Sequence, residues 1–333
     1  MEISWIRRPV IGSGIAFLTI ALFILSPIWI PVLALVDALR GRWRFPLVRF
    51  AGFGFFWCLF EIIGIWWALL LWCTGQGHNV RLHYKLQTWW TKSLIQALGY
   101  TVGLSITVEG AENLGEGPYV AFCRHASLAD SIMSAWVVAT HAHLQPRYVL
   151  KKELKIDPCL DILGHRLPNY FIDRNSPDVS AELMGIEQMA NGLGSKDCAV
   201  IFPEGSRASA KKRIRALDRL RERSPERATR LEGLQFLIAP KPAGASALLN
   251  AVPEANVLTM WHSGFDGLDT FKGVLQHLGA HKAQVHVKVI RHERATVASG
   301  EQFVSWLDAQ WVLMDQAVAQ QLSLDSQQSQ KHR

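Results

Sequence analysis

The chain has 333 residues, a net charge of +7 and a hydrophobic content of 49%. This composition excludes a disordered chain, a collagen-like chain and a channel built from many membrane helices. The length allows one large domain or two small ones. The apolar residues are concentrated near the N-terminus, which predicts a membrane anchor followed by a globular body.

Five cysteines are present, an odd number that includes no CxxC pair. This pattern predicts free thiols in a reducing compartment rather than a disulfide framework or a zinc site. The 12 histidines show no metal-ligand spacing, so no metal site is expected.

Two apolar stretches, 9–36 and 50–74, open the chain. The first contains no charged residue and is too long for the apolar core of a signal peptide, so we expect it to be retained. Pro27 and Pro31 can bend a helix within it. The second stretch carries a single charge, Glu61, which is costly in the middle of a bilayer.

Four arginines lie in the connection between these stretches, at Arg40, Arg42, Arg44 and Arg49. Two complete crossings would place this basic loop on the opposite side of the membrane from a cytoplasmic body, against the positive-inside tendency. We therefore predict a hydrophobic helical hairpin over 1–75 that dips into one leaflet and leaves the polar parts on the cytoplasmic side.

Strand-length and helix-length apolar patterns alternate in the rest of the chain. Residues 82–99 have the spacing of an amphipathic helix. Strands are expected at 105–108, 119–122, 147–150, 170–172, 199–202, 257–261 and 285–290. Helices are expected at 130–142, 178–193, 240–251 and 300–321. This alternation predicts a layered α/β domain over 76–322, followed by a disordered polar tail over 323–333.

The motif HASLAD, at residues 125–130, directly follows the run YVAFCR at 119–124, which contains the expected strand. Ser127 followed by Asp130 resembles a helix N-cap with an acid at the third position, which places His125 in the strand-to-helix turn. A carboxylate there can fold back, fix the imidazole tautomer and support its protonated form, as a general base requires. Taken alone, the spacing is also compatible with an ordinary surface histidine.

Three further motifs place cations at strand ends or at a helix start. FPEGSR forms a tight turn at Gly205 and offers the planar fork of Arg207 to a phosphate. YFIDR carries Arg174, and PKPAG opens a helix at Lys241, where anions bind favourably. Each alone is compatible with an ordinary turn. Because ligands of open α/β sheets bind beyond the carboxyl ends of strands, the four motifs together predict one anion site with a general base.

A basic segment follows FPEGSR directly. Residues 211–230 hold nine Lys and Arg against three acids, and the sequence LDRLRER within them is typical of a short amphipathic helix. The cluster suits anionic headgroups or a polyanionic cofactor, and it is also compatible with a solvated loop. It lacks interleaved aromatic residues, so no nucleic-acid partner is expected.

HASLAD, YFIDR, FPEGSR and the Val252-Pro253 element resemble, in this order, the acyltransferase blocks of the glycerolipid acyltransferase family, which includes 1-acylglycerol-3-phosphate acyltransferases. VLKKELK and LIAPKPAG resemble the branch that contains bacterial inner-membrane acyltransferases and lysocardiolipin acyltransferase-like proteins. The sequence departs from the family at Arg124, where Asn is common, and at Ser206, where Thr is common.

The resemblance implies an O-acyltransferase with a mixed central sheet flanked by helices, held at the inner membrane with its catalytic domain facing the cytoplasm. His125, oriented by Asp130, would act as general base on the free hydroxyl of a lysophospholipid, most simply 1-acyl-sn-glycerol-3-phosphate. The alkoxide would attack acyl-CoA or acyl carrier protein and give phosphatidate, with backbone N–H groups near the motif holding the oxyanion.

No metal, cofactor or covalent intermediate is required for this reaction. The resemblance implies substrate-binding roles for Arg174, Glu204, Gly205, Ser206, Arg207 and Lys241. The residues alone give Glu204 no anion-binding role, and they favour a hydrogen bond from this side chain to a hydroxyl or to Arg207.

Other functions stay open at this point. The acceptor could be another lysophospholipid, as in a remodelling acyltransferase. Water could replace the acceptor hydroxyl, as in a hydrolase, although the chain has no GxSxG nucleophile elbow. A non-enzymatic lipid-binding protein is a third possibility, against which the complete HASLAD and FPEGSR motifs argue. The sequence does not predict the oligomeric state.

Overall fold

The computed structural model describes residues 4–112, 114–127, 129–265 and 284–331, with residues 4–6 and 328–331 described by their backbone alone. The described residues divide into two compact units. The first contains the chain up to residue 105 together with 150–174, and the second contains 106–149 and most of the remainder. The predicted boundary between 75 and 76 differs from this division, because the amphipathic helix that follows it groups with the N-terminal helices.

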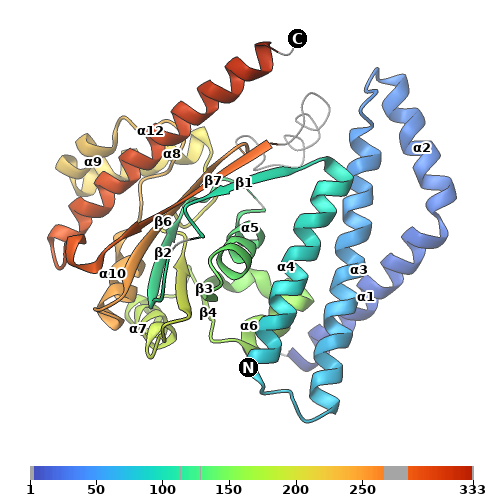
Figure 1. The fold of residues 1–333 in the computed structure, drawn as a ribbon, viewed down its shortest axis with the longest axis horizontal. Coiled ribbons are helices and arrows are strands. Elements are labelled where there is room, and N and C mark those ends of the chain that lie inside the picture. Colours follow the sequence, from blue (N-terminus) through green and yellow to red (C-terminus); the bar gives the residue numbers. More distant parts are fainter. Residues whose placement is uncertain (1–3, 113, 128, 266–283, 332–333) are drawn as a thin grey trace. The chain divides into compact units, whose positions relative to one another are not determined.

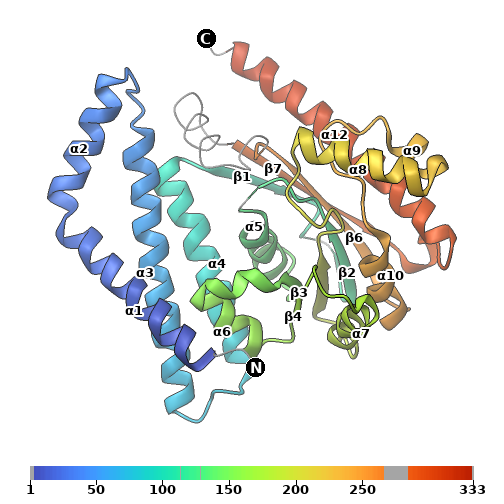
Figure 2. The same cartoon turned by 180° about the vertical axis from the view of Figure 1, so that it is seen from behind.

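Five helices make up most of the first unit. They are α1 (Ser4–Ile24), α2 (Ser26–Leu39), α3 (Pro46–Cys73), α4 (Val80–Val102) and α6 (Pro158–Arg166), accompanied by the 3-10 turn η2 (Lys152–Ile156) and the short strand β4 (Tyr170–Ile172). Helix α3 packs against both α1 and α4 (Figures 1 and 2). The bend expected in the first apolar stretch is present, because α1 ends at Ile24 and Pro27 lies in the first turn of α2.

Two helices of this unit are long and apolar enough to cross a membrane, α1 over Arg7–Ile24 and α3 over Pro46–Cys73. The 28 residues of α3 reach about 42 Å, more than the ~30 Å hydrocarbon core of a bilayer. Large apolar side chains such as Phe23 and Trp66 are exposed on these helices. The lengths and the exposed apolar side chains of α1 and α3 suit a membrane anchor. That the hairpin dips into one leaflet and does not span the bilayer stays a prediction.

Glu61, the single charge in the second apolar stretch, points into the first unit and is buried there. Its carboxyl group accepts hydrogen bonds from Trp90 Nε1 at 3.0 Å, from the backbone nitrogen of Cys159 at 2.9 Å and from Trp57 Nε1 at 3.3 Å. Glu61 therefore joins α3 to α4 and α6. These partners offset the cost of a carboxyl group on an apolar helix.

The second unit is built on a mixed sheet. Its strands are β1 (Ser105–Glu109), β2 (Tyr119–Cys123), β3 (Gln145–Lys151), β5 (Asp197–Ile201), β6 (Asn256–Ser263) and β7 (Gln284–His292), in the order β1-β7-β6-β2-β5-β3. β2 runs parallel to β5 and β6, and β7 runs antiparallel to β6. The sheet order continues from β3 to β4. The last two residues of β3 and all of β4 belong to the first unit. All seven predicted strands are confirmed.

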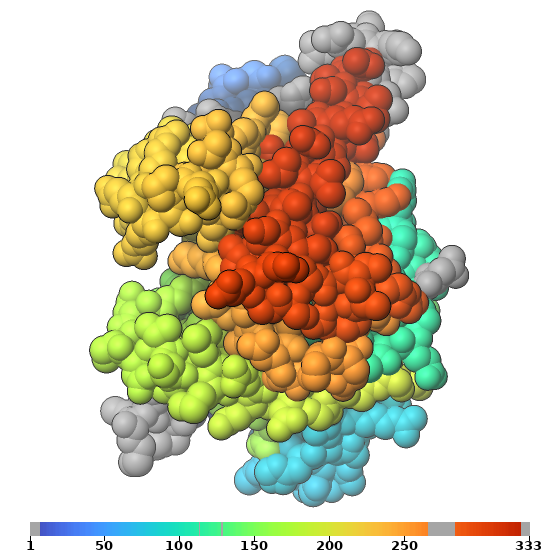
Figure 3. Space-filling view, turned by 90° about the vertical axis from the view of Figure 1, so that its left-hand side faces the viewer, coloured from blue at the N-terminus to red at the C-terminus, as the bar shows by residue number. Residues whose placement is uncertain are grey.

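Helices cover both faces of this sheet (Figures 1 and 2). One face carries α5 (Asp130–Trp136), which continues as a π turn, η1 (Val137–His141). The other carries α7 (Val179–Ala190), α10 (Pro242–Ala251) and α12 (Gln302–Lys331). Helices α8 (Ala210–Arg223) and α9 (Pro225–Leu231) pack on each other, and the pair lies beside α12 in Figure 3. A 3-10 turn, η3 (Arg294–Thr296), follows β7.

The polar C-terminal segment differs from its prediction. Helix α12 continues to Lys331, so the tail predicted as disordered over 323–333 is helical as far as that residue. Gln and Lys are good helix formers, and the side chain of Gln321 donates to Asp325 one turn further on. A polar composition alone therefore does not end a helix that already has a packed N-terminal half.

The central strand β2 positions the candidate site. It is buried along its whole length, as expected for a parallel strand with both neighbours in place. The HASLAD motif follows the carboxyl end of β2 and therefore lies where the parallel strands end.

Candidate active site

The HASLAD motif forms the turn between β2, which ends at Cys123, and α5, which begins at Asp130. The backbone nitrogen of Arg124 donates to the carbonyl of Met260 on β6 at 2.9 Å, which holds the start of the turn in the sheet. The N-cap of α5 is Ala129, which makes no side-chain cap. The prediction of an N-cap at residue 127 is therefore wrong. Leu128 lies outside the described residues.

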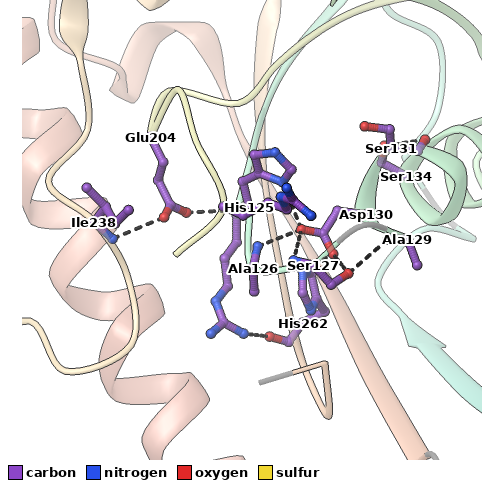
Figure 4. Close-up of polar contacts among 12 residues, drawn as sticks. His125, Ala126, Ser127, Ala129, Asp130, Ser131, Ser134, Glu204, Ile238 and His262 are labelled. Carbon is purple, nitrogen blue, oxygen red and sulfur yellow. Dashed lines mark hydrogen bonds and ion pairs between the residues drawn. The ribbon is translucent and has the colours of Figure 1, made fainter. Parts of the chain in front are cut away.

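The carboxylate of Asp130 lies in contact with several residues of this turn (Figure 4). Its Oδ2 accepts the backbone N–H groups of Ala126 at 2.5 Å and Ser127 at 2.7 Å, and it lies 2.9 Å from Nδ1 of His125. Its Oδ1 accepts the hydroxyl of Ser127. The predicted fold-back of Asp130 onto His125 is confirmed, and Ser127 serves as a donor to that acid instead of capping the helix.

Asp130 is held in its ionised form. Burial raises the pKa of this carboxyl. The nearby charge of His262 and the hydrogen bond from His125 lower the pKa by more than burial raises it, so the pKa lies well below its ordinary value. An ionised Asp130 can stabilise the imidazolium that forms when His125 takes a proton.

His125 is oriented with one ring nitrogen committed and the other free for chemistry. The contact between Nδ1 and Asp130 assigns the hydrogen to Nδ1 and the lone pair to Nε2, an assignment that follows from the hydrogen-bond network. The side chain keeps 19% of its surface exposed. Its ring lies 4.9 Å from that of Phe202, centroid to centroid. The arrangement has the geometry of a general base.

Glu204 contacts the backbone of the same histidine. Its Oε1 accepts the backbone N–H of His125 at 2.8 Å and its Oε2 accepts that of Ile238 at 3.0 Å. Burial raises the pKa of Glu204 to about 8, although these two bonds and the charge of Arg124 lower it. The structure thus gives Glu204 backbone partners in place of the expected hydroxyl or guanidinium, while its substrate contact stays a prediction.

The FPEGSR turn is tied to His125 on both sides. Ala208, which follows the motif, donates its backbone N–H to the carbonyl of His125 at 2.7 Å, and Glu204 precedes the turn with its own contact. Ser206 and Arg207 lie between these two attachments and are half-buried. The structure therefore brings both predicted substrate-binding residues next to the candidate base.

Lys241 reaches the same turn. Its backbone nitrogen donates to the carbonyl of Pro203 at 2.8 Å. Gly205 has a φ of +69°, which favours glycine, and a Cβ added there would lie 3.2 Å from the Lys241 Nζ. Arg174 follows β4 in the first unit and is not placed relative to His125. Its role in substrate binding stays a prediction.

The backbone N–H groups closest to the base are already committed. That of His125 binds Glu204, and those of Ala126 and Ser127 bind Asp130. The expectation that backbone N–H groups near the motif hold the oxyanion is therefore wrong for these three residues. A donor to a developing oxyanion must come from elsewhere in the site.

Sequence reasoning missed two residues that shape the site, His262 and Asp315. His262 of β6 places Nε2 3.3 Å from Oδ1 of Asp130. Asp315 of α12 accepts the backbone N–H groups of residues 235–237 at 2.7–2.8 Å, which fixes the loop that presents Ile238 to Glu204. Neither residue has a spacing signal, because strand pairing and helix packing bring both in from far along the chain.

The described part of the chain contains no group of three or more His, Cys, Asp or Glu residues that could hold a metal ion. The five cysteines are free thiols, three of them buried.

A His–Asp pair in the turn after a buried parallel strand defines an α/β domain whose candidate site has the geometry of a general base. Residues 105–236 match the family model described as Acyltransferase. The 1-acyl-sn-glycerol-3-phosphate acyltransferase of Saccharomyces cerevisiae is 25% identical over 163 residues, which are 49% of this chain and 48% of the yeast protein. Residues 105–236 thus match an acyltransferase domain, and the chain is similar to a member of the glycerolipid acyltransferase family.

The chain spans about half the length of the curated relative that it matches. Among solved structures, it is similar to the 1-acyl-sn-glycerophosphate (LPA) acyltransferase PlsC from Thermotoga maritima. That match covers 79% of this chain and 94% of the other, with 16% identity and a TM-score of 0.46.

Proposed function

We propose that this chain is an O-acyltransferase that moves an acyl group from acyl-CoA, or from acyl carrier protein, to the free hydroxyl of a lysophospholipid. The first candidate acceptor is 1-acyl-sn-glycerol-3-phosphate, and the product is then phosphatidate. The names of the family model and of the yeast relative support this class of reaction.

The observation that carries the proposal is the 2.9 Å contact between His125 Nδ1 and Asp130 Oδ2, with the histidine partly exposed and the acid buried. In the proposed reaction, Nε2 of His125 takes the proton of the acceptor hydroxyl while the oxygen of that hydroxyl attacks the thioester carbonyl. Asp130 stabilises the imidazolium. Collapse of the tetrahedral intermediate expels the thiolate, which receives the proton, and the ester bond replaces the thioester bond.

The acceptor phosphate is proposed to bind at the FPEGSR turn. Arg207 supplies a fork-shaped pair of donors, Lys241 a point charge and Ser206 a hydroxyl, around the close backbone approach that Gly205 allows. Arg174 is proposed as a further cation for the same phosphate. Charge-assisted hydrogen bonds of this kind contribute about twice as much as neutral ones.

Helix α8 is proposed to meet phosphate groups of the membrane or of CoA. It carries seven Lys and Arg residues against two acids, and Ile214 is exposed among them. We place the protein at the inner membrane with its catalytic unit facing the cytoplasm. Neutralising Lys211, Lys212, Arg213 and Arg215 together should weaken binding to anionic vesicles and lower activity. Unchanged binding and activity would count against this role.

The reaction is tested with membranes that contain the wild-type chain or His125→Ala. Labelled acyl-CoA is supplied with 1-acyl-sn-glycerol-3-phosphate or with other lysophospholipids, and lipid product and free CoA are both followed. We expect phosphatidate from the wild type and none above background from the variant. His78→Ala, which changes an exposed histidine, is the matched control and should behave as wild type.

Each alternative gives a distinct result in this assay. Acylation of a different lysophospholipid would keep the reaction and change the acceptor. Free CoA without any acylated lipid would indicate a hydrolase. Equal activity of wild type and His125→Ala would show that the assignment of His125 as the base is wrong.

A further inference from the structure

His262 reaches the candidate site through the register of the central sheet. β6 pairs with β2 in parallel, with Met260 opposite Cys123. Arg124 then continues the ladder by donating its backbone N–H to the carbonyl of Met260. Two residues further along β6, the carbonyl of His262 accepts a hydrogen bond from the buried guanidinium of Arg124. The strand therefore delivers the imidazole of His262 directly to the HASLAD turn.

Asp130 lies between two histidines. Oδ2 faces Nδ1 of His125 at 2.9 Å, and Oδ1 faces Nε2 of His262 at 3.3 Å. His262 is 1% exposed, and its ring and that of Phe265 form a T-shaped pair with centroids 5.5 Å apart. Among the described residues, neither ring nitrogen of His262 has a hydrogen-bond partner, so its contact with Asp130 is an ion pair by distance. A buried polar group with so few partners costs free energy that an apolar side chain would not, which points to a role for the contact with Asp130.

The origin of the partners of Asp130 shows what His262 adds. The other partners described above, in His125, Ala126 and Ser127, all belong to the HASLAD turn. They fix the carboxylate within the turn, and they reach the sheet only through the backbone of the turn, which Arg124 attaches to β6. His262 belongs to the sheet itself, so its contact ties the carboxylate to a rigid element.

We propose that His262 is a positioning residue, which holds Oδ1 of Asp130 from β6 so that Oδ2 stays aimed at Nδ1 of His125. This inference rests on the proposed function. Because His262 acts through Asp130, its loss should lower kcat and leave KM for both substrates unchanged. A small displacement of a catalytic group lowers the rate by up to about 100-fold, so a loss of roughly 10- to 100-fold is expected.

The test compares substitutions that differ in whether they can still reach Asp130. His262→Gln places an amide nitrogen near the position of Nε2 and should keep most of the wild-type kcat. His262→Met has a similar length and no donor, and it should show the full loss. His262→Asn is polar but too short to reach Oδ1, so it should resemble His262→Met. The full-length chain is used in each case, and thermal unfolding is recorded beside the kinetics.

A second comparison separates positioning from a general loss of structure. In an Asp130→Asn background, His262→Met should cause no further loss of kcat, because the group through which it acts is already changed. If the losses multiply, the proposal is overturned. It is also overturned if kcat is unchanged in all three variants, or if KM rises while kcat is preserved.

Two outcomes keep the test decisive. If His262→Met unfolds, the comparison of Gln with Asn decides, and equal kcat values for these two would contradict the proposal. If the wild-type chain acylates no lysophospholipid, the proposed function has failed. An active wild type with indifferent His262 variants means that only the role of His262 has failed.

Discussion

The two compact units both bury carboxyl groups, but they give them different partners. In the first unit, Glu61 binds chiefly to groups on two neighbouring helices, and Asp161 pairs with the guanidinium groups of two arginines from α1. In the second unit, Asp130, Glu204 and Asp315 accept backbone N–H groups of short loops. Carboxyl groups thus join helices at Glu61 and Asp161 and shape loops around the candidate site. The contrast concerns these positions, because in the second unit Asp308 of α12 also joins helices by binding Arg227 of α9.

This difference bears on function. A carboxyl group that joins two helices contributes stability and leaves their surfaces free to vary. A carboxyl group that accepts neighbouring backbone N–H groups fixes the path of a loop, and so the direction of its side chains. The acids of the first unit should therefore affect unfolding, and those around His125 should affect the rate of acyl transfer.

The largest effect is expected from Asp130→Asn. The amide that replaces one carboxylate oxygen cannot accept at both positions, and it removes the charge that supports the imidazolium of His125. We expect kcat to fall by roughly 10²- to 10⁴-fold, the range of a misoriented general base. Steady-state acyl transfer measures this loss, and circular dichroism checks the fold. A variant with wild-type kcat would contradict the role of the His–Asp pair.

Glu204→Gln should affect both stability and rate. Its amide can accept only one of the two N–H groups from His125 and Ile238, which leaves a buried donor unsatisfied at a cost of about 1–3 kcal/mol. The backbone of His125 then loses an attachment, so kcat should fall less than in Asp130→Asn. Urea unfolding and kinetics on the same preparation measure the two effects. A stability loss with unchanged kcat would contradict the orienting role of Glu204.

Glu204 also predicts a pH dependence of the free energy of unfolding. Its pKa is raised from 4.5 to about 8 by burial, so the folded state holds the proton more tightly than the unfolded state does. The resulting stabilisation is complete below pH 4.5 and is lost as the pH rises through 8. Relative to Glu204→Gln, which cannot titrate, the wild type should lose stability over this interval. A difference that does not vary with pH would show that the pKa is not raised.

Glu61→Gln provides the contrast from the first unit. Loss of one acceptor weakens the bonds to Trp90 and Cys159, and we expect the free energy of unfolding to fall by about 1–3 kcal/mol. The kcat per folded molecule should be unchanged. Thermal unfolding in detergent and kinetics at a temperature where the variant is folded give both values. A loss of kcat comparable to that of Asp130→Asn would break the contrast between the two units.

The smallest effect is expected from Asp161→Asn. Arg7 and Arg8 keep 27% and 35% of their side-chain surface exposed, so solvent screens the pair and its contribution is about 1 kcal/mol or less. Burial raises the pKa of Asp161. Hydrogen bonds from His165 and Arg8 lower it by more than burial raises it, so the pKa lies below its ordinary value of 3.8. The stabilisation is therefore present above pH 3.8 and is lost as the pH falls below it. Unfolding of wild type and variant should converge at acid pH, and a gap that widens there would contradict this sign.

The sequence predicted the parts of the molecule that depend on local pattern. All seven strands follow from short apolar runs, and the fold-back of Asp130 onto His125 follows from a spacing within one turn. The FPEGSR turn was placed at a strand end for the same reason. Its contacts with His125 were not predicted, because they depend on which strands are neighbours.

Long-range partners account for most of what the sequence did not predict. The short helix α6 has no simple apolar stripe, and its acid Asp161 is buried only because Arg7 and Arg8 arrive from α1. His262 is one histidine within an apolar strand, and its meaning depends on the pairing of β6 with β2. Asp315 lies in a helical pattern that predicts the helix but not which loop its carboxylate binds.

The most direct test of acyl transfer by the His125–Asp130 pair measures the release of CoA from acyl-CoA with and without 1-acyl-sn-glycerol-3-phosphate, in wild type, Asp130→Asn and Glu61→Gln side by side. We expect release to require the acceptor and to match the phosphatidate formed. Asp130→Asn should lower it by roughly 10²- to 10⁴-fold, and folded Glu61→Gln should retain it. Acceptor-dependent release that survives in Asp130→Asn, or that is lost equally in both variants, would contradict the central claim that the His125–Asp130 pair performs acyl transfer.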